Sequence, residues 1–203
     1  NFYDTSKEVK WATETAGILD SFMALDVISN HEKIDSKKIG IMGWSWGGMV
    51  SIEAQHLFNI NLSNVRNKFA LHFAIYPWCN HYDDESMHTT DSPLFILAGE
   101  KDIVTPAILC QEYVNKLVDL KKTNKNIQIL SGATHTYDTQ EKWSGEYSIV
   151  DPECRITIQG DGSIIVKPNN PDMWYNLIEN GGWFSNKGNK ELSSYIHELC
   201  WAW

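Results

Sequence analysis

A serine lies between small residues in Gly-Trp-Ser-Trp-Gly-Gly, residues 43–48 of the chain. The pattern Gly-x-Ser-x-Gly is typical of a nucleophile elbow when a strand precedes it and a helix follows. Such a turn projects the serine hydroxyl above the strand ends, where the N-terminus of the next helix favours developing negative charge. We therefore interpret Ser45 as a candidate nucleophile. The alternative is a glycine-rich turn that contains a serine by chance, so the rest of the chain has to decide.

A base and an acid follow Ser45 in the order that this chemistry needs. A serine hydroxyl is a weak nucleophile until a base takes its proton, and the base needs a carboxylate to orient it. In hydrolases with a nucleophile elbow, the acid and then the histidine follow the serine, each after a strand. Asp102 follows the apolar run 93–98, and His135 follows the run 126–130. The sequence thus predicts a triad of Ser45, His135 and Asp102.

Other residues compete for these roles. Glu100 lies on the same predicted loop as Asp102 but closer to the strand end, which makes it the less favoured acid. His72 falls inside an apolar run, where we expect a packed core residue. The remaining histidines outside the acidic loop fall on predicted helices or in a polar break and are interpreted as surface residues: His31, His56 and His197.

An acidic loop at residues 80–91 holds His81 and His88 with three carboxylates between them. Their spacing matches no common pattern of metal ligands. We interpret the segment as a solvated loop near the mouth of the pocket and expect neither a metal nor an organic cofactor.

The composition limits the classes of partner. The chain has 203 residues, with 17 Lys and Arg against 26 Asp and Glu, a formal net charge of −9. An acidic surface repels phosphate backbones and anionic lipid, so we expect no nucleic-acid partner. No apolar run approaches the roughly 20 residues that a membrane-spanning helix needs. The chain starts with Asn1 rather than Met, and we expect a preceding segment that was removed or lies elsewhere.

The predicted elements alternate between strand and helix, which favours a parallel α/β sheet. Residues 68–76 are apolar on both faces, as in a strand covered by helices on each side. The tail from 147 to 167 resembles a hairpin that turns at Gly160-Asp161-Gly162. In chain order we expect a helix at 8–28, a strand at 38–42, a helix at 49–58, strands at 68–76 and 93–98, a helix at 105–120, a strand at 126–130, the hairpin, and short helices at 172–179 and 190–203.

We expect one domain, with a core at 1–142 and a hairpin and helical extension at 143–203. One feature does not fit a complete sheet. The run 38–42 is apolar throughout, which suits a central strand, yet only one predicted helix precedes it. If this strand is central, further strands must pair with its other side, since a free edge invites aggregation. We therefore expect a segment or chain, outside this sequence, that completes the sheet.

Three motifs together resemble the α/β-hydrolase fold and, within it, the dienelactone hydrolase family. They are Gly43 to Gly48, Gly99-Glu100-Lys101-Asp102 with Pro106, and Gly132-Ala133-Thr134-His135-Thr136-Tyr137-Asp138, and the likeness covers about residues 9–138. The resemblance implies the C-terminal portion of a mostly parallel sheet flanked by helices. It also implies Ser45 as nucleophile, His135 as general base, Asp102 as its acid, and the backbone N–H of Trp46 as one oxyanion-hole donor.

Two departures from the family pattern bear on activity. The enzyme that names the family has cysteine as its nucleophile, where this chain has Ser45, and this favours general ester hydrolysis over dienelactone cleavage. The family draws its second oxyanion donor from a loop after an N-terminal strand, and this sequence begins after that point. Losing one such donor costs about 10²–10³ in rate.

The four cysteines form no Cys-x-x-Cys pair, so their spacing alone leaves two disulfides and four free thiols equally open. Some family members thought to be exported carry similar Tyr-Pro-x-Cys and Thr-Pro-Ala…Cys motifs. That resemblance implies a Cys79–Cys110 disulfide and, with less support, a second disulfide between Cys154 and Cys200. It favours a periplasmic or secreted protein, with a cytoplasmic protein as the alternative.

The sequence therefore predicts a serine hydrolase that cleaves an ester or related acyl bond in a small molecule, without a cofactor. The alternatives are a peptidase of the prolyl oligopeptidase type and a catalytically silent hydrolase-like binding protein. The aromatic residues expected around the substrate are Trp44, Trp46, Tyr76 and Trp78; the two that flank Ser45 have the alternative of packing beneath the elbow.

Overall fold

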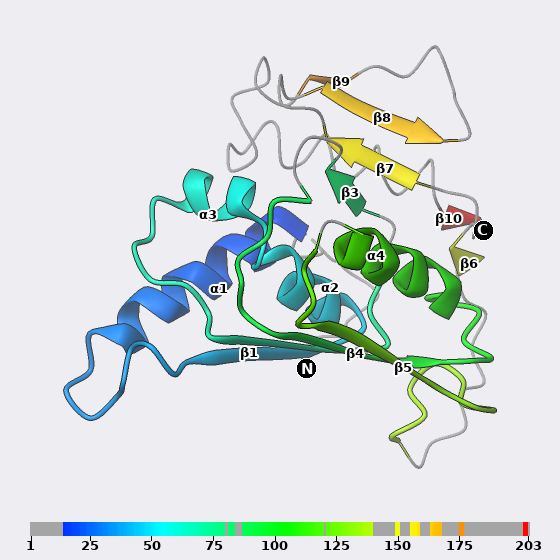
Figure 1. Cartoon of the computed structure of the whole chain (residues 1–203), viewed down its shortest axis with the longest axis horizontal. Helices are drawn as coiled ribbons and strands as arrows, with labels where there is room; N and C mark the ends of the chain where they lie inside the picture. The colour runs from blue at the N-terminus through cyan, green and yellow to red at the C-terminus, as the bar shows by residue number, and fades with distance from the viewer. Residues whose placement is uncertain are drawn as a thin grey trace, which may run out of the picture.

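A computed structural model of the chain describes residues 14–79, 81–83, 87–119 and 121–139, together with five short strands in the tail. Four parallel strands form the main sheet in the order β1-β2-β4-β5. Within the described chain, all four helices lie over one face of this sheet (Figure 1). The strands are β1 (Gly40–Trp44), β2 (Leu71–Ile75), β4 (Leu94–Gly99) and β5 (Lys125–Leu130), and the helices are α1 (Glu14–Ser29), α2 (Trp46–Glu53), α3 (Leu57–Ser63) and α4 (Ala107–Asp119).

The strand register brings the carboxyl ends of all four strands to one edge of the sheet. Trp44 of β1 pairs with Ile75 of β2, and Gly99 of β4 pairs with Leu130 of β5. Because the strands are parallel, the segments that follow them leave from the same edge. The predicted alternation of strands and helices is confirmed, and it brings the three predicted triad loops, which follow β1, β4 and β5, to the same edge of the sheet.

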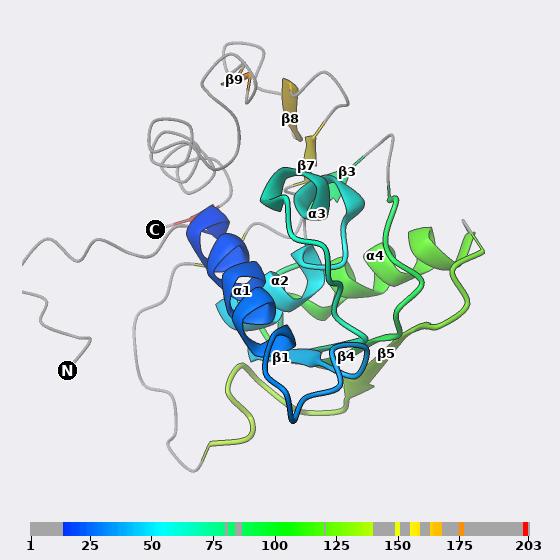
Figure 2. The ribbon, with the colours of Figure 1, turned by 90° about the vertical axis from the view of Figure 1, so that its left-hand side faces the viewer.

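The core lies between the helices and the sheet. Ile18, Phe22 and Leu25 recur at helical spacing on α1 and are fully buried. Helix α1 packs against α2, which covers β1 and β2 (Figure 2). Helix α4 covers β4 and β5 through its own buried stripe, which consists of Leu109, Tyr113 and Leu117. The predicted first helix is confirmed from Glu14 onward, and its earlier residues lie outside the described chain.

The opposite face of the sheet differs from the expectation that helices cover both faces. Met42, Leu71 and Ile129 are 55%, 45% and 41% exposed. In the residues that the structure describes, no helix lies over this face (Figure 1). Strand β1, whose sequence predicts a central position, is an edge strand of the sheet within that same set of residues.

The predicted helix at 49–58 is two helices, α2 and α3. The chain leaves the helical conformation at His56, whose φ of −69° and ψ of 127° are those of extended backbone. The surface position expected for His56 is wrong, because the residue is 4% exposed and its Nε2 lies 2.8 Å from the hydroxyl of Tyr113. The neighbouring Gln55 donates to the same hydroxyl at 2.9 Å. These buried side-chain bonds fix the break between the helices.

The tail partly matches expectation (Figure 1). The predicted hairpin is confirmed by the antiparallel pairing of β7 (Arg155–Ile158) with β8 (Ser163–Lys167). Short strands also form where we expected a loop or helices, because a neighbouring strand supplies backbone hydrogen-bond partners there. They are β3 (His81–Asp83) beside β7, β9 (Tyr175–Asn176) beside β8, and β10 (Trp201–Ala202) beside β6 (Ile149–Val150).

The helix predictions for 172–179 and 190–203 are therefore wrong at residues 175–176 and 201–202, and their other residues lie outside the described chain. The proposed boundary near residue 142 also lies outside it and stays a prediction. Among the described helices, none is both long and apolar enough to cross a membrane.

Candidate active site

The turn between β1 and α2 holds Ser45 in an unusual backbone conformation. Its φ of 51° and ψ of −115° lie in a region that residues with a side chain rarely adopt. Hydrogen bonds fix the residue on both sides, since its N–H donates to the carbonyl of Ile75 at 2.9 Å and its own carbonyl accepts from Met49 N–H at 3.0 Å. The turn points the serine side chain away from the core, as a nucleophile elbow requires.

The two glycines of the Gly-x-Ser-x-Gly pattern have different reasons to be small. A Cβ on Gly43 would lie 2.1 Å from the carbonyl oxygen of Gly47, so only glycine fits there. A Cβ on Gly47 would have no neighbour within 4 Å. Close approach of strand and helix thus explains Gly43 and does not explain Gly47.

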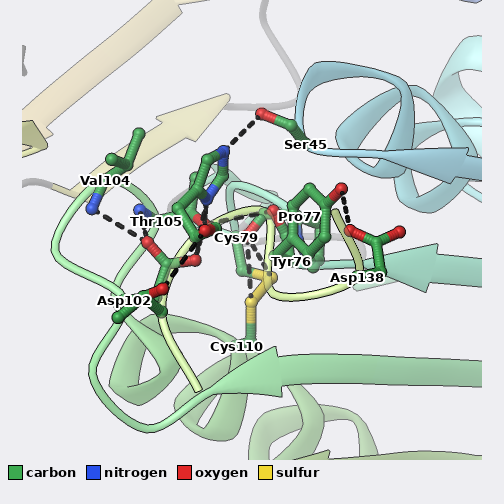
Figure 3. A network of polar contacts seen from close by, with 11 residues as sticks. Ser45, Tyr76, Pro77, Cys79, Asp102, Val104, Thr105, Cys110 and Asp138 are labelled. Atoms are coloured by element: carbon green, nitrogen blue, oxygen red, sulfur yellow. Dashed lines mark hydrogen bonds and ion pairs between the residues drawn. A yellow bond between two sulfur atoms is a disulfide. The ribbon is translucent and has the colours of Figure 1, made fainter. Parts of the chain in front are cut away.

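The three predicted triad residues meet at the carboxyl edge of the sheet, where Figure 3 labels Ser45 and Asp102. His135 Nε2 lies 3.0 Å from Ser45 Oγ, and His135 Nδ1 lies 2.8 Å from Asp102 Oδ2. His135 and Asp102 are 6% and 5% exposed. The hydrogen-bond network assigns the proton of a neutral imidazole to Nδ1, since the carboxylate can only accept. The lone pair of Nε2 then faces the serine hydroxyl, which is the arrangement of a general base.

Asp102 is held by its own loop. Its Oδ1 accepts from the N–H groups of Val104 and Thr105, both at 2.9 Å, and its Oδ2 accepts from the Thr105 hydroxyl at 2.8 Å as well as from His135. Charge-assisted bonds of this kind offset the free-energy cost of burying a carboxylate. They also fix the direction in which the carboxylate faces the imidazole.

Thr105 is a residue of the site whose role the sequence analysis missed. Its hydroxyl lies 3.2 Å from His135 Nδ1 and 3.1 Å from the backbone carbonyl of Tyr76, in addition to its bond with Asp102 (Figure 3). A signal was present in the sequence. An aspartate followed three residues later by a threonine, just before α4, is typical of the hydrogen-bonded turns that start helices.

The competing acid, Glu100, has a different set of contacts. It is exposed, and its Oε2 accepts from the N–H of Gly132 at 2.7 Å and from the hydroxyl of Ser131 at 2.9 Å. These two bonds, that of Gly132 first, lower the pKa of the carboxyl group. Gly132 has a φ of +73°, the left-handed conformation that glycine favours. Glu100 thus fastens the turn that leads to His135, while Asp102 contacts the imidazole.

The four aromatic residues expected in the pocket occupy different surroundings. The ring of Tyr76 packs edge-on against His135, with centroids 4.7 Å apart. Trp44 is partly exposed and donates from Nε1 to Asp138 at 2.9 Å. Trp46 is partly exposed, and its indole lies against Gly17 of α1, whereas Trp78 is buried. Their contacts with a substrate stay a prediction.

The predicted oxyanion donor, the N–H of Trp46, belongs to the first residue of α2. The first N–H groups of a helix have no acceptor within it, so this donor is available near Ser45. Its catalytic role also stays a prediction.

A disulfide joins the segment after β2 to α4. Cys79 and Cys110 are bonded, with their Cα atoms 4.9 Å apart, so the predicted pair is confirmed (Figure 3). Both cysteines are buried. Cys154 and Cys200 lie outside the described residues. Within the described chain, no group of three His, Cys, Asp or Glu side chains could hold a metal ion.

Comparison with known proteins identifies the family. Residues 3–150 match the profile of the Dienelactone hydrolase family. The chain belongs to the dienelactone hydrolase family. No curated protein sequence matched this family member.

Solved structures similar to this dienelactone hydrolase family member share its α/β-hydrolase fold. The propionate-bound esterase Est2 of Thermogutta terrifontis aligns with a TM-score of 0.50 at 14% identity, over 62% of this chain and 57% of the esterase. An alpha-beta serine hydrolase homologue from Coxiella burnetii gives a TM-score of 0.47 at 20% identity, over 68% of this chain and 60% of the homologue. The chain therefore spans less than two thirds of the length of either protein, and at 14% identity the likeness to Est2 shows the fold alone.

Proposed function

We propose that this chain carries the catalytic triad of a serine hydrolase that cleaves an ester or related acyl bond in a small molecule. The observation that carries the proposal is the continuous contact from Ser45 Oγ to His135 Nε2, at 3.0 Å, and from His135 Nδ1 to Asp102, at 2.8 Å. Membership of the dienelactone hydrolase family supports a hydrolase.

In the proposed reaction, Ser45 Oγ attacks the acyl carbonyl while His135 Nε2 takes the hydroxyl proton. Asp102 stabilises the imidazolium that forms. The N–H of Trp46 donates to the oxyanion of the tetrahedral intermediate. The intermediate collapses as His135 gives its proton to the leaving oxygen, so an alcohol departs and an acyl-serine remains. Water, deprotonated by His135, then releases the acid and restores Ser45.

A fluorophosphonate probe tests the proposal in the complete protein. We expect one covalent adduct, found on Ser45 by peptide mass spectrometry, and no adduct in Ser45→Ala. His135→Asn should slow labelling because the variant has no base. Failure of the complete, folded protein to form the adduct would favour a catalytically silent binding protein. Short p-nitrophenyl esters should be hydrolysed faster than proline-containing peptides, and the reverse order would favour a peptidase.

We further propose that a second oxyanion donor comes from a segment that pairs with the free side of β1. Two observations support this. Strand β1 is an edge strand within the described chain, and the chain spans 57% of the similar esterase. Adding the segment should raise the rate of hydrolysis by about 10²–10³, the effect of one oxyanion donor. Equal rates with and without it would contradict this part of the proposal.

The Cys79–Cys110 disulfide supports the proposal that the protein works in the periplasm or outside the cell, because disulfides persist in oxidising compartments. Alkylation of thiols in freshly lysed cells measures this. Because both cysteines are buried, the protein is denatured without reductant before alkylation. We expect both cysteines to resist alkylation under these conditions, and their modification would contradict export.

A further inference from the structure

Asp138 links the loop that carries His135 to the ends of two strands. Its Oδ1 accepts from the hydroxyl of Tyr76 at 2.9 Å, and its Oδ2 accepts from Trp44 Nε1 at 2.9 Å. Trp44 ends β1, directly before Ser45, and Tyr76 follows the last residue of β2. Figure 3 shows the carboxylate facing the Tyr76 hydroxyl. A single side chain thus ties the histidine loop to the elbow and to the neighbouring strand.

Tyr76 connects this carboxylate with the imidazole. Its ring packs edge-on against His135, with centroids 4.7 Å apart, and against Tyr137, at 5.3 Å. Burial, followed by the bond to Asp138, raises the pKa of the Tyr76 hydroxyl, so it stays a donor throughout the neutral range. The ring therefore lies between the proposed base and Asp138, in contact with both.

The backbone of Tyr76 is itself fixed, which makes the ring a firm support. Its φ of 36° is unusual for a residue with a side chain. Its N–H donates to the carbonyl of Leu97 at 2.7 Å, and its carbonyl oxygen lies 3.1 Å from the hydroxyl oxygen of Thr105. The contact between the Tyr76 ring and His135 therefore also fixes the imidazole relative to the loop that carries Asp102.

The histidine loop needs such a support at its far end. Thr136, the residue after His135, has a φ of 55°, a left-handed conformation that costs about 1–2 kcal/mol in a residue other than glycine. Glu100 fastens the near end through Ser131 and Gly132. Asp138 is the corresponding anchor at the far end, so the two carboxylates bracket the imidazole.

We propose that Asp138 is a positioning residue, which acts through Tyr76 and Trp44 to keep His135 Nε2 within hydrogen-bond distance of Ser45 Oγ. The inference rests on the proposed serine hydrolase function. A general base works only within about 2.6–3.2 Å of the proton that it takes. A displacement of about 1 Å lowers the rate about 10²-fold. Asp138 itself does not contact the reacting atoms.

The test compares Asp138→Ala, Asp138→Asn and Tyr76→Phe with the complete wild-type protein, and kcat is expressed per serine titrated with a fluorophosphonate. We expect Asp138→Ala to lower kcat about 10- to 100-fold and to change KM less than about twofold. Asp138→Asn keeps one carbonyl acceptor and should lose less. Tyr76→Phe removes one donor but keeps the ring, so a smaller loss is expected. Asp20→Asn on α1 is the matched control for removing a surface charge and should match the wild type.

Proton NMR of the His135–Asp102 hydrogen bond separates this inference from the proposed function. We expect the low-field Nδ1 proton of His135 to exchange with water at least about tenfold faster in Asp138→Ala. A wild-type kcat per titrated serine in that variant, even with a lower melting temperature, would overturn the positioning role. If the wild type forms no Ser45 adduct, the proposed function fails, and an unchanged exchange rate in Asp138→Ala would then overturn the inference by itself.

Discussion

His72 should lower the unfolding free energy in mild acid, at a pH above the range in which ordinary carboxylates become protonated. The residue is fully buried in β2, where its Nδ1 donates to the carbonyl of Ser51 at 2.8 Å and its Nε2 has no hydrogen-bond partner among the residues that the structure describes. Burial is the main cause that lowers its pKa from 6.5 to about 4, and the bond to Ser51 opposes that shift. Protonation would place a charged N–H at Nε2 in the core, and no described residue offers it an acceptor.

The sign and size of the effect follow from the two pKa values. Between pH 6.5 and 4 the unfolded chain binds the proton and the folded chain does not, so acid favours unfolding. The contribution of His72 is fully present above pH 6.5 and is lost as the pH falls towards 4. From a pKa of about 4 against 6.5, the loss of unfolding free energy is about 2 kcal/mol at pH 5 and about 3 kcal/mol at pH 4.

Urea unfolding at pH 7 and pH 5, followed by tryptophan fluorescence, measures this loss. The comparison variant is His72→Asn, whose amide can donate to Ser51 in the position of Nδ1 but does not titrate. We expect the stability advantage of the wild type over the variant to shrink by about 2 kcal/mol between the two pH values. A difference that stays constant within about 0.5 kcal/mol would refute the argument, whatever the stability of the variant at pH 7.

Three further outcomes are expected. Replacing Thr105 by valine removes a hydroxyl donor to the buried carboxylate of Asp102 and should lower kcat by about tenfold. Serine at this position keeps the hydroxyl and should retain most of the rate. Equal kcat values for the valine and serine variants would contradict the role of this hydrogen bond. Reduction of the disulfide, or the Cys79→Ser/Cys110→Ser double variant, should lower the unfolding free energy by about 3.7 kcal/mol because the bridge spans 31 residues, as measured by urea unfolding. Gly43→Ala should abolish fluorophosphonate labelling, since its methyl group would clash with the carbonyl oxygen of Gly47. Gly47→Ala should give a folded protein that is still labelled, because a methyl group there has no close neighbour. Labelling of Gly43→Ala at the wild-type rate would contradict this steric argument.

The sequence was sufficient to place Ser45, Asp102 and His135 together because it contains the three facts that matter. Each residue follows an apolar strand, the strands are parallel, and the carboxyl ends of parallel strands share an edge. The same reasoning produced the element order of the main sheet and the hairpin of the tail. None of these inferences depends on a contact between side chains that are distant in sequence.

The features that sequence reasoning missed depend on such contacts. His56 is buried because Tyr113, 57 residues away, offers it a hydroxyl. The partners of Asp138 lie 62 and 94 residues away, so no local pattern marks it. The predicted helix at 49–58 breaks at His56 because of the same contact with Tyr113. The short strands of the tail form because other strands pair with them. Local propensity predicts an element well only where distant partners agree with it.

The backbone of Ser45 has a consequence for how such a chain could change. At a φ of 51° and a ψ of −115°, glycine would have a lower conformational energy than serine, and a chain optimised for stability alone would carry glycine there. Under the proposed function, serine is a compromise here, because the fold gives up some unfolding free energy to hold a half-buried hydroxyl beside His135. In related proteins that have lost hydrolase activity, we expect glycine to replace serine at this position, because the substitution would relieve the backbone strain. The residue at position 45 would then indicate whether the site is active.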